Sequence, residues 1–270
     1  MPGRPTLLRR AARSAQLRAA DAAELALGRR DRLTPPRRMR ELAGDSDFHA
    51  TGREFLTHFT ALADLRPDDR VLDIGCGAGR MARPLAGVLR PPGSYDGFDV
   101  MRGAIEWCAA HYDRTSAPFR FRHADVRNAA YNPGASQPAA TYSFPYADQG
   151  FDLALATSVF THLLEDEADR YLAETARVLA PGGRLLCTWL LSSPERPLGP
   201  GAAFCLRPWQ GGAVSVADPA VPQAVVSFPE DWLRGRLPAH GLRLREPLHR
   251  GTWSGGPGLS FQDIAVAERA

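Results

Sequence analysis

Residues 71–80 read Val-Leu-Asp-Ile-Gly-Cys-Gly-Ala-Gly-Arg, a short apolar run followed by three alternate glycines. The run is typical of a buried strand, and Gly75, Gly77 and Gly79 predict a turn whose backbone can approach a ligand closely. The helix expected over residues 78–89 would present free N–H groups and the positive end of its dipole at this turn. The stretch therefore predicts a site for an anionic or carboxylate-bearing, nucleotide-like ligand.

Two aspartates follow the next two predicted strands. Asp99 ends the strand expected over residues 95–99, 24 residues after Gly75, and Asp125 follows the strand expected over 119–123. An acid about 20 residues after such a turn accepts hydrogen bonds from ribose hydroxyls, and Asp125 can accept from an exocyclic amine. Ligands of open α/β sheets bind at the carboxyl ends of adjacent parallel strands, so the turn and both aspartates are expected in one site.

Strand and helix patterns alternate on both sides of this turn. We expect strands over 70–74, 95–99, 119–123, 151–156, 184–191, 242–248 and 260–267, with helices near 55–62 and over 78–89, 101–111, 166–179 and from about 229. Such alternation predicts an α/β fold with a Rossmann-like, seven-stranded, mostly parallel sheet flanked by helices. Residues 128–142 and the Pro- and Gly-rich residues 192–228 lack a clear period, so we interpret them as a loop and as an excursion after strand five.

Two parts are expected in the chain: an Arg/Ala-rich arm over 1–44 and one domain over 45–270. Apolar residues recur at helical spacing over 4–30, and Thr34-Pro35-Pro36 breaks the pattern. The arm is either a helix that packs on a neighbouring subunit, making a homo-oligomer, or on a polyanion, or it is a weakly ordered extension.

Composition excludes several classes of protein. Every one of the 33 basic residues is arginine, which suggests a GC-rich bacterial source, and 11 of them lie in residues 1–40 beside three acids. Residues 41–270 hold 22 Arg and 27 acids, an acidic balance that argues against nucleic acid as a partner. No run is long enough to span a membrane, and the start carries no export signal, so we expect a cytoplasmic protein. The four cysteines show no paired spacing, so neither a metal site nor a disulfide framework is expected.

Taken together, the motifs resemble those of class I S-adenosylmethionine-dependent methyltransferases, in particular the bacterial enzymes that act on small molecules. Residues 71–80 resemble motif I of this family. The family's motifs at strands two, three, four and five are similar to residues 97–99, 123–126, 144–153 and 177–183, respectively. The resemblance covers about residues 45–191. The rival nicotinamide cofactor fits less well, because G-x-G-x-x-G counted from Gly75 and Gly77 needs glycine where Arg80 stands.

The resemblance implies S-adenosyl-L-methionine as cofactor and S-adenosyl-L-homocysteine as product. It assigns the methionine portion to Asp73, Gly75, Cys76, Gly77, Gly79 and Arg80, the ribose and adenine to Asp99, Val100, Met101, Ala124, Asp125 and Val126, and the amino-acid end and methyl group to Thr157 and Ser158. Residues 156–159 read Ala-Thr-Ser-Val, so they differ from the Asn/Asp-Pro-Pro-Tyr motif of enzymes that methylate amino groups of nucleic acids.

His162 is the candidate general base for the acceptor, since its ordinary pKa of about 6.5 suits proton removal near neutrality. The alternative is a structural histidine at a helix start. We expect an aromatic acceptor pocket from the segment before strand one, residues 142–146 and residues 192–228, lined by His49, Tyr146, Phe160, Trp209 and Trp253.

The expected function is methyl transfer to a small-molecule acceptor, in bacterial secondary metabolism. Oxygen, nitrogen and carbon stay open as the acceptor atom, with an electron-rich aromatic carbon such as that of an indole as one option. A protein that binds S-adenosylmethionine without turnover is the alternative from another class.

Overall fold

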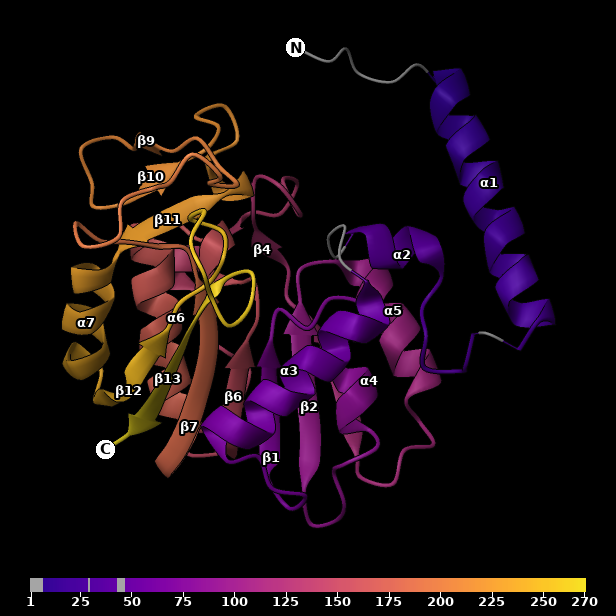
Figure 1. The fold of residues 1–270 in the computed structure, drawn as a ribbon. Helices are drawn as coiled ribbons and strands as arrows, with labels where there is room; N and C mark the ends of the chain where they lie inside the picture. Colours follow the sequence, from indigo (N-terminus) through magenta and orange to yellow (C-terminus); the bar gives the residue numbers. More distant parts are fainter. Residues whose placement is uncertain (1–6, 29, 43–46) are drawn as a thin grey trace.

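The computed structural model describes residues 7–28, 30–42 and 47–270, and a seven-stranded sheet forms its centre (Figure 1). From one edge to the other the strands are β12 (Leu242–His249), β13 (Asp263–Arg269), β7 (Leu179–Trp189), β6 (Phe151–Ala156), β1 (Arg70–Ile74), β2 (Ser94–Asp99) and β3 (Phe119–His123). The strand β13 runs antiparallel to both of its neighbours, and every other neighbouring pair in this sheet is parallel. The predicted fold class is thereby confirmed.

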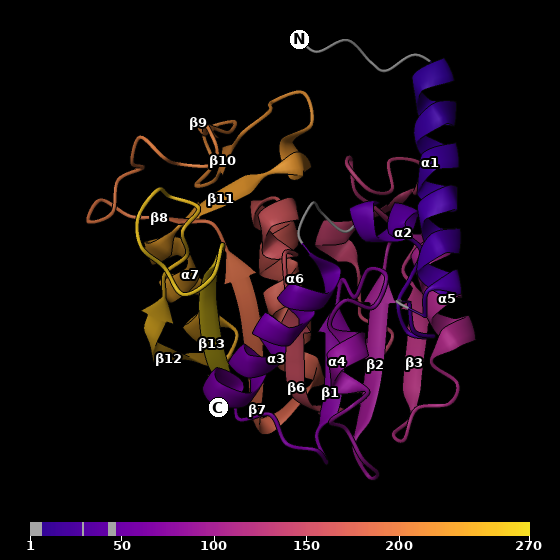
Figure 2. The same ribbon diagram turned by 45° about the vertical axis from the view of Figure 1, so that its right-hand side comes forward.

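Helices cover both faces of the sheet, as the alternating side chains of its strands require. In β1, Val71 packs against one layer, built from α3 (Phe48–Ala63), α4 (Ala82–Leu85) and α5 (Arg102–His111). The next residue, Leu72, packs on the opposite side against α6 (Glu165–Val178) and α7 (Glu230–Ala239). Because successive residues of a strand point to opposite faces, a continuous apolar run is buried on both sides. In Figure 2, α3 and α4 cross in front of the strands of the sheet.

Three predicted elements have different bounds in the structure. The helix expected over 78–89 is only the short α4, whose Pro84 has no N–H to donate. Residues 181–183, expected to separate α6 from the fifth strand, lie within β7, where Gly182 has a φ of 73°. They form a bulge, since Phe151 of β6 pairs with Leu179 but Leu153 pairs with Arg184. The last strand begins at Asp263 instead of residue 260.

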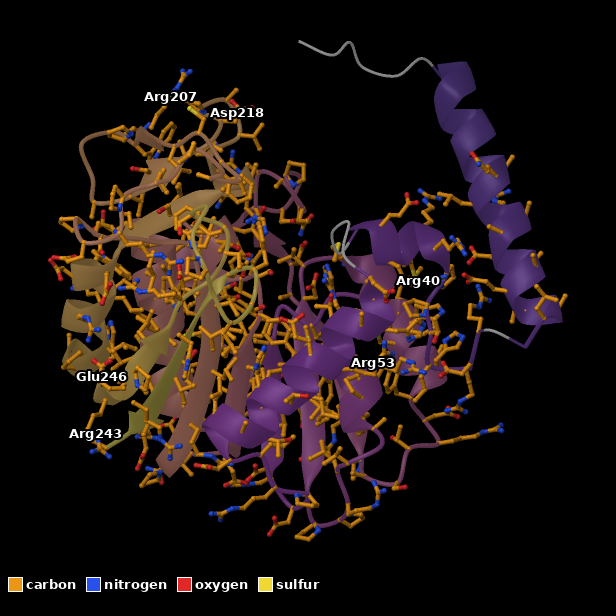
Figure 3. The ribbon with its side chains drawn as sticks, viewed as in Figure 1. Arg40, Arg53, Arg207, Asp218, Arg243 and Glu246 are labelled. Atoms are coloured by element: carbon orange, nitrogen blue, oxygen red, sulfur yellow. The ribbon has the colours of Figure 1, made fainter. Side chains whose placement is uncertain are left out.

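The excursion contains a small second sheet, which its irregular sequence pattern did not indicate. Its strands in order are β8 (Leu191–Ser192), β11 (Val226–Pro229), β10 (Ser215–Val216) and β9 (Arg207–Pro208). Val216, Val226 and Phe228 are buried in the core that α6 and α7 share. The side chains of Arg207 and Asp218 point outward at the far edge (Figure 3). The excursion therefore packs on the main domain through its apolar side.

The segment between β3 and β6 is also more ordered than expected. It contains β4 (Val126–Arg127) and β5 (Gln137–Pro138), which pair in parallel, and a 3-10 helix η1 (Ala139–Thr141). Two further 3-10 helices are η2 (Phe160–His162) after β6 and η3 (Pro222–Ala224) within the excursion. Both lie beside the site described below.

The arm forms α1 (Leu7–Ala26) and α2 (Arg37–Leu42), joined by ion pairs. Glu24 of α1 pairs with Arg37 and Arg40 of α2. In both views α1 stands apart from the sheet, on the side of α2 (Figures 1 and 2). Residues 4–6 of the expected arm helix and residues 43–46, at the expected boundary of the two parts, lie outside the described residues. Within the described ranges, no helix is long and apolar enough to cross a membrane.

Candidate functional site

The glycine turn after β1 brings the backbone to the carboxyl edge of the sheet. Gly75 and Gly77 have φ values of 71° and 53°, in the left-handed region that favours glycine. A Cβ on Gly75 would lie 2.6 Å from Cγ2 of Val159, so a side chain there would collide with the residue that precedes η2. The N–H groups of Gly75 and Cys76 both donate to the main-chain oxygen of Phe98, which ties the turn to β2.

Asp99 lies beside this turn at the end of β2. Its Oδ2 accepts the N–H of Gly77 at 2.8 Å, and its Oδ1 accepts the N–H of Met101 at 2.7 Å. Burial raises the pKa of this carboxyl above its usual value, and the two backbone donors oppose that shift. Each oxygen keeps a second lone pair, so Asp99 can accept two further hydrogen bonds from a ligand.

Asp73 is fully buried near the carboxyl end of β1, below the glycine turn. The hydroxyl of Tyr95 donates to its Oδ2 at 2.6 Å, whereas its Oδ1 has no hydrogen-bond partner among the residues that the structure describes. Burial raises the pKa of Asp73 to about 7. An unpaired buried carboxylate oxygen is costly, and a cation bound above it would offset that cost.

A cavity of about 680 Å³ opens at this edge of the sheet. Its wall combines the glycine turn, the ends of β2 and β6, η2, part of the excursion and the segment before β13. Of the residues singled out from sequence, those that line it are Gly75, Cys76, Gly77, Arg80, Asp99, Val100, Met101, Val126, Thr157, Ser158 and His162. Residues from positions 75 to 162 are thus brought together, as parallel strand ends require.

Four residues predicted for the cofactor stand behind or beside this wall. Asp73 lies within β1, below the turn. Gly79 ends the turn, and a Cβ added there would lie 3.0 Å from the hydroxyl oxygen of Tyr112. Ala124 is buried and donates its N–H to the main-chain oxygen of Asp99. Asp125 is exposed, and Asn132 donates to its Oδ1 at 3.4 Å.

The aromatic pocket expected from sequence is not where the structure places those side chains. Phe160 is fully buried and stacks on Trp189, with ring centres 4.1 Å apart. Trp253 is equally buried and donates from Nε1 to Asp263 at 2.7 Å. Tyr146 packs edge-on against Phe151. The prediction was wrong for these rings because aromatic residue type does not distinguish a core side chain from a pocket wall.

The two remaining acceptor residues also lie outside the cavity lining. Trp209 packs, partly buried, against the core of the α6 and α7 layer. His49 lies on α3, where its ring contacts Phe48 edge-on. Burial and the positive charge of Arg83 lower the pKa of His49. None of the five predicted acceptor residues is among the described residues that line the cavity.

His162, in contrast, faces the cavity in a defined protonation state. Its Nδ1 lies 3.0 Å from the main-chain oxygen of Gln223, and its Nε2 lies 3.3 Å from the hydroxyl of Tyr131. A carbonyl oxygen only accepts, so Nδ1 carries the proton and the lone pair of Nε2 points toward Tyr131. Burial lowers the pKa of the imidazole, which keeps it neutral at physiological pH.

Sequence reasoning missed several residues of this wall. Tyr131 comes from the segment interpreted as a featureless loop, and burial raises the pKa of its phenol, so the hydroxyl stays protonated. Phe204 of the excursion and Phe261 and Gln262, which precede β13, also line the cavity. No local pattern marks them, because each reaches the site through contacts far apart in sequence.

A strained residue closes this side of the cavity. Ser158 follows β6 with a φ of 57°, which is uncommon outside glycine. Its N–H donates to Oγ1 of Thr188 at 2.7 Å, and this bond helps to hold the left-handed conformation. Strain of this kind clusters where a chain presents groups to a ligand.

Comparison with known proteins supports the same interpretation of the edge. Residues 71–183 match the family model described as a methyltransferase domain. The match covers less than half of the chain and shows that residues 71–183 are similar to a methyltransferase domain. The matched residues run from β1 to the bulge of β7, so they include the glycine turn, Asp99 and His162.

Two curated relatives are similar to about half of this chain. Phthiotriol/phenolphthiotriol dimycocerosates methyltransferase 1 of Mycobacterium ulcerans is 35% identical over 129 residues, which is 47% of this chain and 39% of that protein. The fatty-acid O-methyltransferase of Mycolicibacterium smegmatis is 34% identical over 133 residues, 49% of this chain and 41% of that protein. The alignments therefore span about two fifths of the length of these relatives.

A solved structure matches over the whole chain. The 1,6-didemethyltoxoflavin-N1-methyltransferase of Burkholderia thailandensis, crystallised with its substrate and S-adenosylhomocysteine, superposes with a TM-score of 0.52 at 20% identity. The match covers 100% of this chain and 94% of that one. At this level of identity the likeness establishes the shared fold.

Proposed function

We propose that this chain transfers a methyl group from S-adenosyl-L-methionine to an oxygen atom of an apolar small molecule. The observation that carries the proposal is the single cavity that joins the glycine turn and Asp99 to the Nε2 atom of His162. A cofactor held at one end of that cavity and an acceptor held at the other would meet within it.

The cofactor end offers groups that suit S-adenosylmethionine. The free lone pairs of Asp99 would accept from the two ribose hydroxyls, and the turn at residues 75–79 leaves room for the methionine portion. The unpaired Oδ1 of Asp73 lies where the cofactor's positive charge would stabilise it. Val100 and Met101 would flank the adenine, and the exposed carboxylate of Asp125, next to Val126 of the cavity wall, would accept from its amine.

The acceptor end supplies a base. When bound, S-adenosylmethionine supplies an electrophilic methyl group with a good leaving group attached. The residues of this chain orient the acceptor and receive its proton: Nε2 of His162 accepts the hydroxyl proton, while Nδ1 keeps its own proton on the Gln223 carbonyl. A hydroxyl must lose its proton when its oxygen is methylated, and the neutral imidazole of His162 is placed to accept that proton.

We propose an apolar acceptor because the cavity wall beyond His162 is lined by apolar side chains. Its side chains include Leu163, Leu190, Phe204, Val225 and Phe261. The Mycolicibacterium relative is named for fatty acids, which are apolar acceptors with an oxygen end. A role in bacterial secondary metabolism forms part of the same proposal.

The deciding experiment is calorimetric titration of the full chain with S-adenosylhomocysteine, with NAD as the control. We expect micromolar binding of the first and none of the second. Binding of NAD alone would overturn the assignment of the glycine turn. The second stage mixes the protein with methyl-labelled S-adenosylmethionine and a panel of hydroxyl, amine and indole compounds, with products analysed by mass spectrometry and NMR.

The second stage separates the remaining alternatives. Label recovered on oxygen supports the proposal, whereas label on nitrogen or on an indole carbon would replace its acceptor atom. If S-adenosylhomocysteine binds but no compound of the panel is methylated, the chain is better explained as a cofactor-binding protein that has no methyltransferase activity.

A further inference from the structure

Gln262 is a further polar side chain at the acceptor end of the cavity. Two hydrogen bonds to its amide oxygen, and a third between the two residues that donate them, define its orientation. Its Oε1 accepts the hydroxyl of Thr188 at 2.5 Å and the hydroxyl of Ser158 at 3.2 Å. Thr188 is fully buried, and its Oγ1 already accepts the N–H of Ser158. In the structure its hydroxyl donates to Gln262, which places the amide oxygen, and not the amide nitrogen, on that side.

This arrangement leaves the amide NH2 group facing away from both hydroxyls. Across the described part of the chain, Nε2 of Gln262 has no hydrogen-bond partner, and the side chain lines the cavity. On the side away from the two hydroxyls its neighbours are apolar: Phe261, which is 49% exposed, Phe204, whose ring centre lies 6.2 Å from that of Phe261, and the buried Leu190. A donor with a fixed direction in an apolar wall is a recognition element for one acceptor atom of a ligand.

We propose that the Gln262 amide binds a second oxygen of the acceptor molecule, a carbonyl oxygen, at a distance from the hydroxyl that is methylated. This inference rests on the proposed function and narrows its substrate to apolar hydroxy-carbonyl compounds. NH2 only donates, so the ligand atom must be an acceptor. A neutral carbonyl suits it better than a carboxylate, because the amide carries no charge that could offset the hydration a carboxylate loses on binding.

The position of Gln262 favours the acceptor over the cofactor. It lies outside residues 71–183, the segment that matches the methyltransferase domain and carries the turn and Asp99. Its neighbours in the wall come from the excursion and from the segment before β13, which also lie outside that match. The competing assignment is a contact with the carboxylate of the cofactor's methionine, through the shared contact with Ser158.

The test uses two probes of similar shape, acetophenone and ethylbenzene, titrated into the full chain saturated with S-adenosylhomocysteine. Ethylbenzene is more hydrophobic, so the two dissociation constants are not compared directly. For each protein the dissociation constant of ethylbenzene is divided by that of acetophenone, and the informative quantity is the quotient of this ratio in the wild type and in Gln262→Glu. The variant keeps an oxygen for Thr188 and Ser158 but replaces the NH2 group. We expect this quotient to favour acetophenone by about three- to tenfold, the size of one neutral hydrogen bond.

A second measurement does not depend on the variant's stability. In the 15N-labelled wild type, the side-chain amide resonance of Gln262 should shift with acetophenone and not with ethylbenzene. The inference is overturned if the quotient stays near one, if acetophenone does not bind at millimolar concentration, or if the resonance moves on addition of S-adenosylhomocysteine alone. Failure of S-adenosylhomocysteine to bind at all would instead contradict the proposed function, so the two failures are distinguishable.

Discussion

The Nδ1 atom of His162 lies 3.0 Å from the main-chain oxygen of Gln223, a residue 61 positions later in the chain. The side chain of Gln223 is itself held, because its Nε2 donates to Glu167 at 2.7 Å and its Oε1 accepts the N–H of Ala129. The excursion is thereby tied to η2, α6 and the loop after β4. This set of bonds gives His162 one tautomer and one orientation, which is what a general base requires.

Replacement of His162 tests the base directly. We expect His162→Ala to lower turnover by ~10²–10⁴, because the group that takes the acceptor proton is removed. Affinity for S-adenosylhomocysteine should stay unchanged in calorimetry. The control is Tyr131→Phe, which removes the hydroxyl next to Nε2 but leaves the lone pair of His162 available, and should retain most turnover. A fully active His162→Ala protein would return the residue to a structural role.

Gln223 is expected to act through His162 as a positioning residue. In Gln223→Leu the N–H of Ala129 loses the Gln223 side chain as its acceptor and the carboxylate of Glu167 keeps the N–H of Leu164 as a donor, which should lower the free energy of unfolding by about 1–3 kcal/mol. The carbonyl that holds Nδ1 would shift with η3, so kcat should fall while KM for S-adenosylmethionine stays constant. Asp218→Asn, at the outward edge of the same excursion (Figure 3), should change neither quantity. Equal loss of kcat in both variants would argue against the role of Gln223.

Asp99 is expected to carry much of the cofactor affinity. Asp99→Ala should weaken binding of S-adenosylhomocysteine by roughly 1–3 kcal/mol, since the ribose hydroxyls would lose their acceptor and two backbone N–H groups would lose theirs. Asp96→Asn is the matched control: Asp96 lies on the same strand but pairs with Arg120 and is not in the cavity wall. Calorimetry of the two variants compares them. Unchanged affinity in Asp99→Ala would remove Asp99 from the site.

The raised pKa of Asp73 predicts a pH dependence of cofactor binding. With a pKa of about 7 in the unliganded protein, Asp73 is largely protonated below neutrality. Bound positive charge favours the ionised form, so below pH 7 binding must release a proton. Affinity should therefore rise from pH 5 to pH 7, by up to about tenfold per pH unit, and level off above. The groups that act on Asp73 are Tyr95, Asp99 and Arg80.

Asp73→Asn provides the control for this pH profile. The amide oxygen can still accept from Tyr95, but the group no longer titrates in this range. Its affinity for S-adenosylhomocysteine should vary less with pH than that of the wild type. Parallel profiles for the two proteins would assign the dependence to another group, Asp99 being the next candidate because burial raises its pKa too.

Local pattern predicted the sheet and the cofactor end well, and the acceptor end poorly. The strands over 119–123 and 151–156 have the predicted bounds, because an apolar run between turn residues is a local signal. The turn at 75–79, Asp99 and His162 meet because parallel strands end at one edge. The Tyr131–His162–Gln223 contacts and the Gln262 amide join segments about 30 to 100 residues apart, and no local periodicity records such contacts.

Trp253 offers a test of the corrected acceptor wall. In Trp253→Phe the Nε1–H donor to Asp263 is lost, while the N–H groups of Gly251 and Leu191 still donate to that carboxylate. A buried acceptor that loses one of three donors should lower the free energy of unfolding by about 1–3 kcal/mol, measured by denaturant titration. KM for the acceptor found in the panel should not change, because Trp253 lies outside the cavity lining.

Phe204→Ala, in that lining, should raise the same KM with a smaller effect on stability, because its ring is only half-buried. The reverse pattern would restore Trp253 to the acceptor pocket.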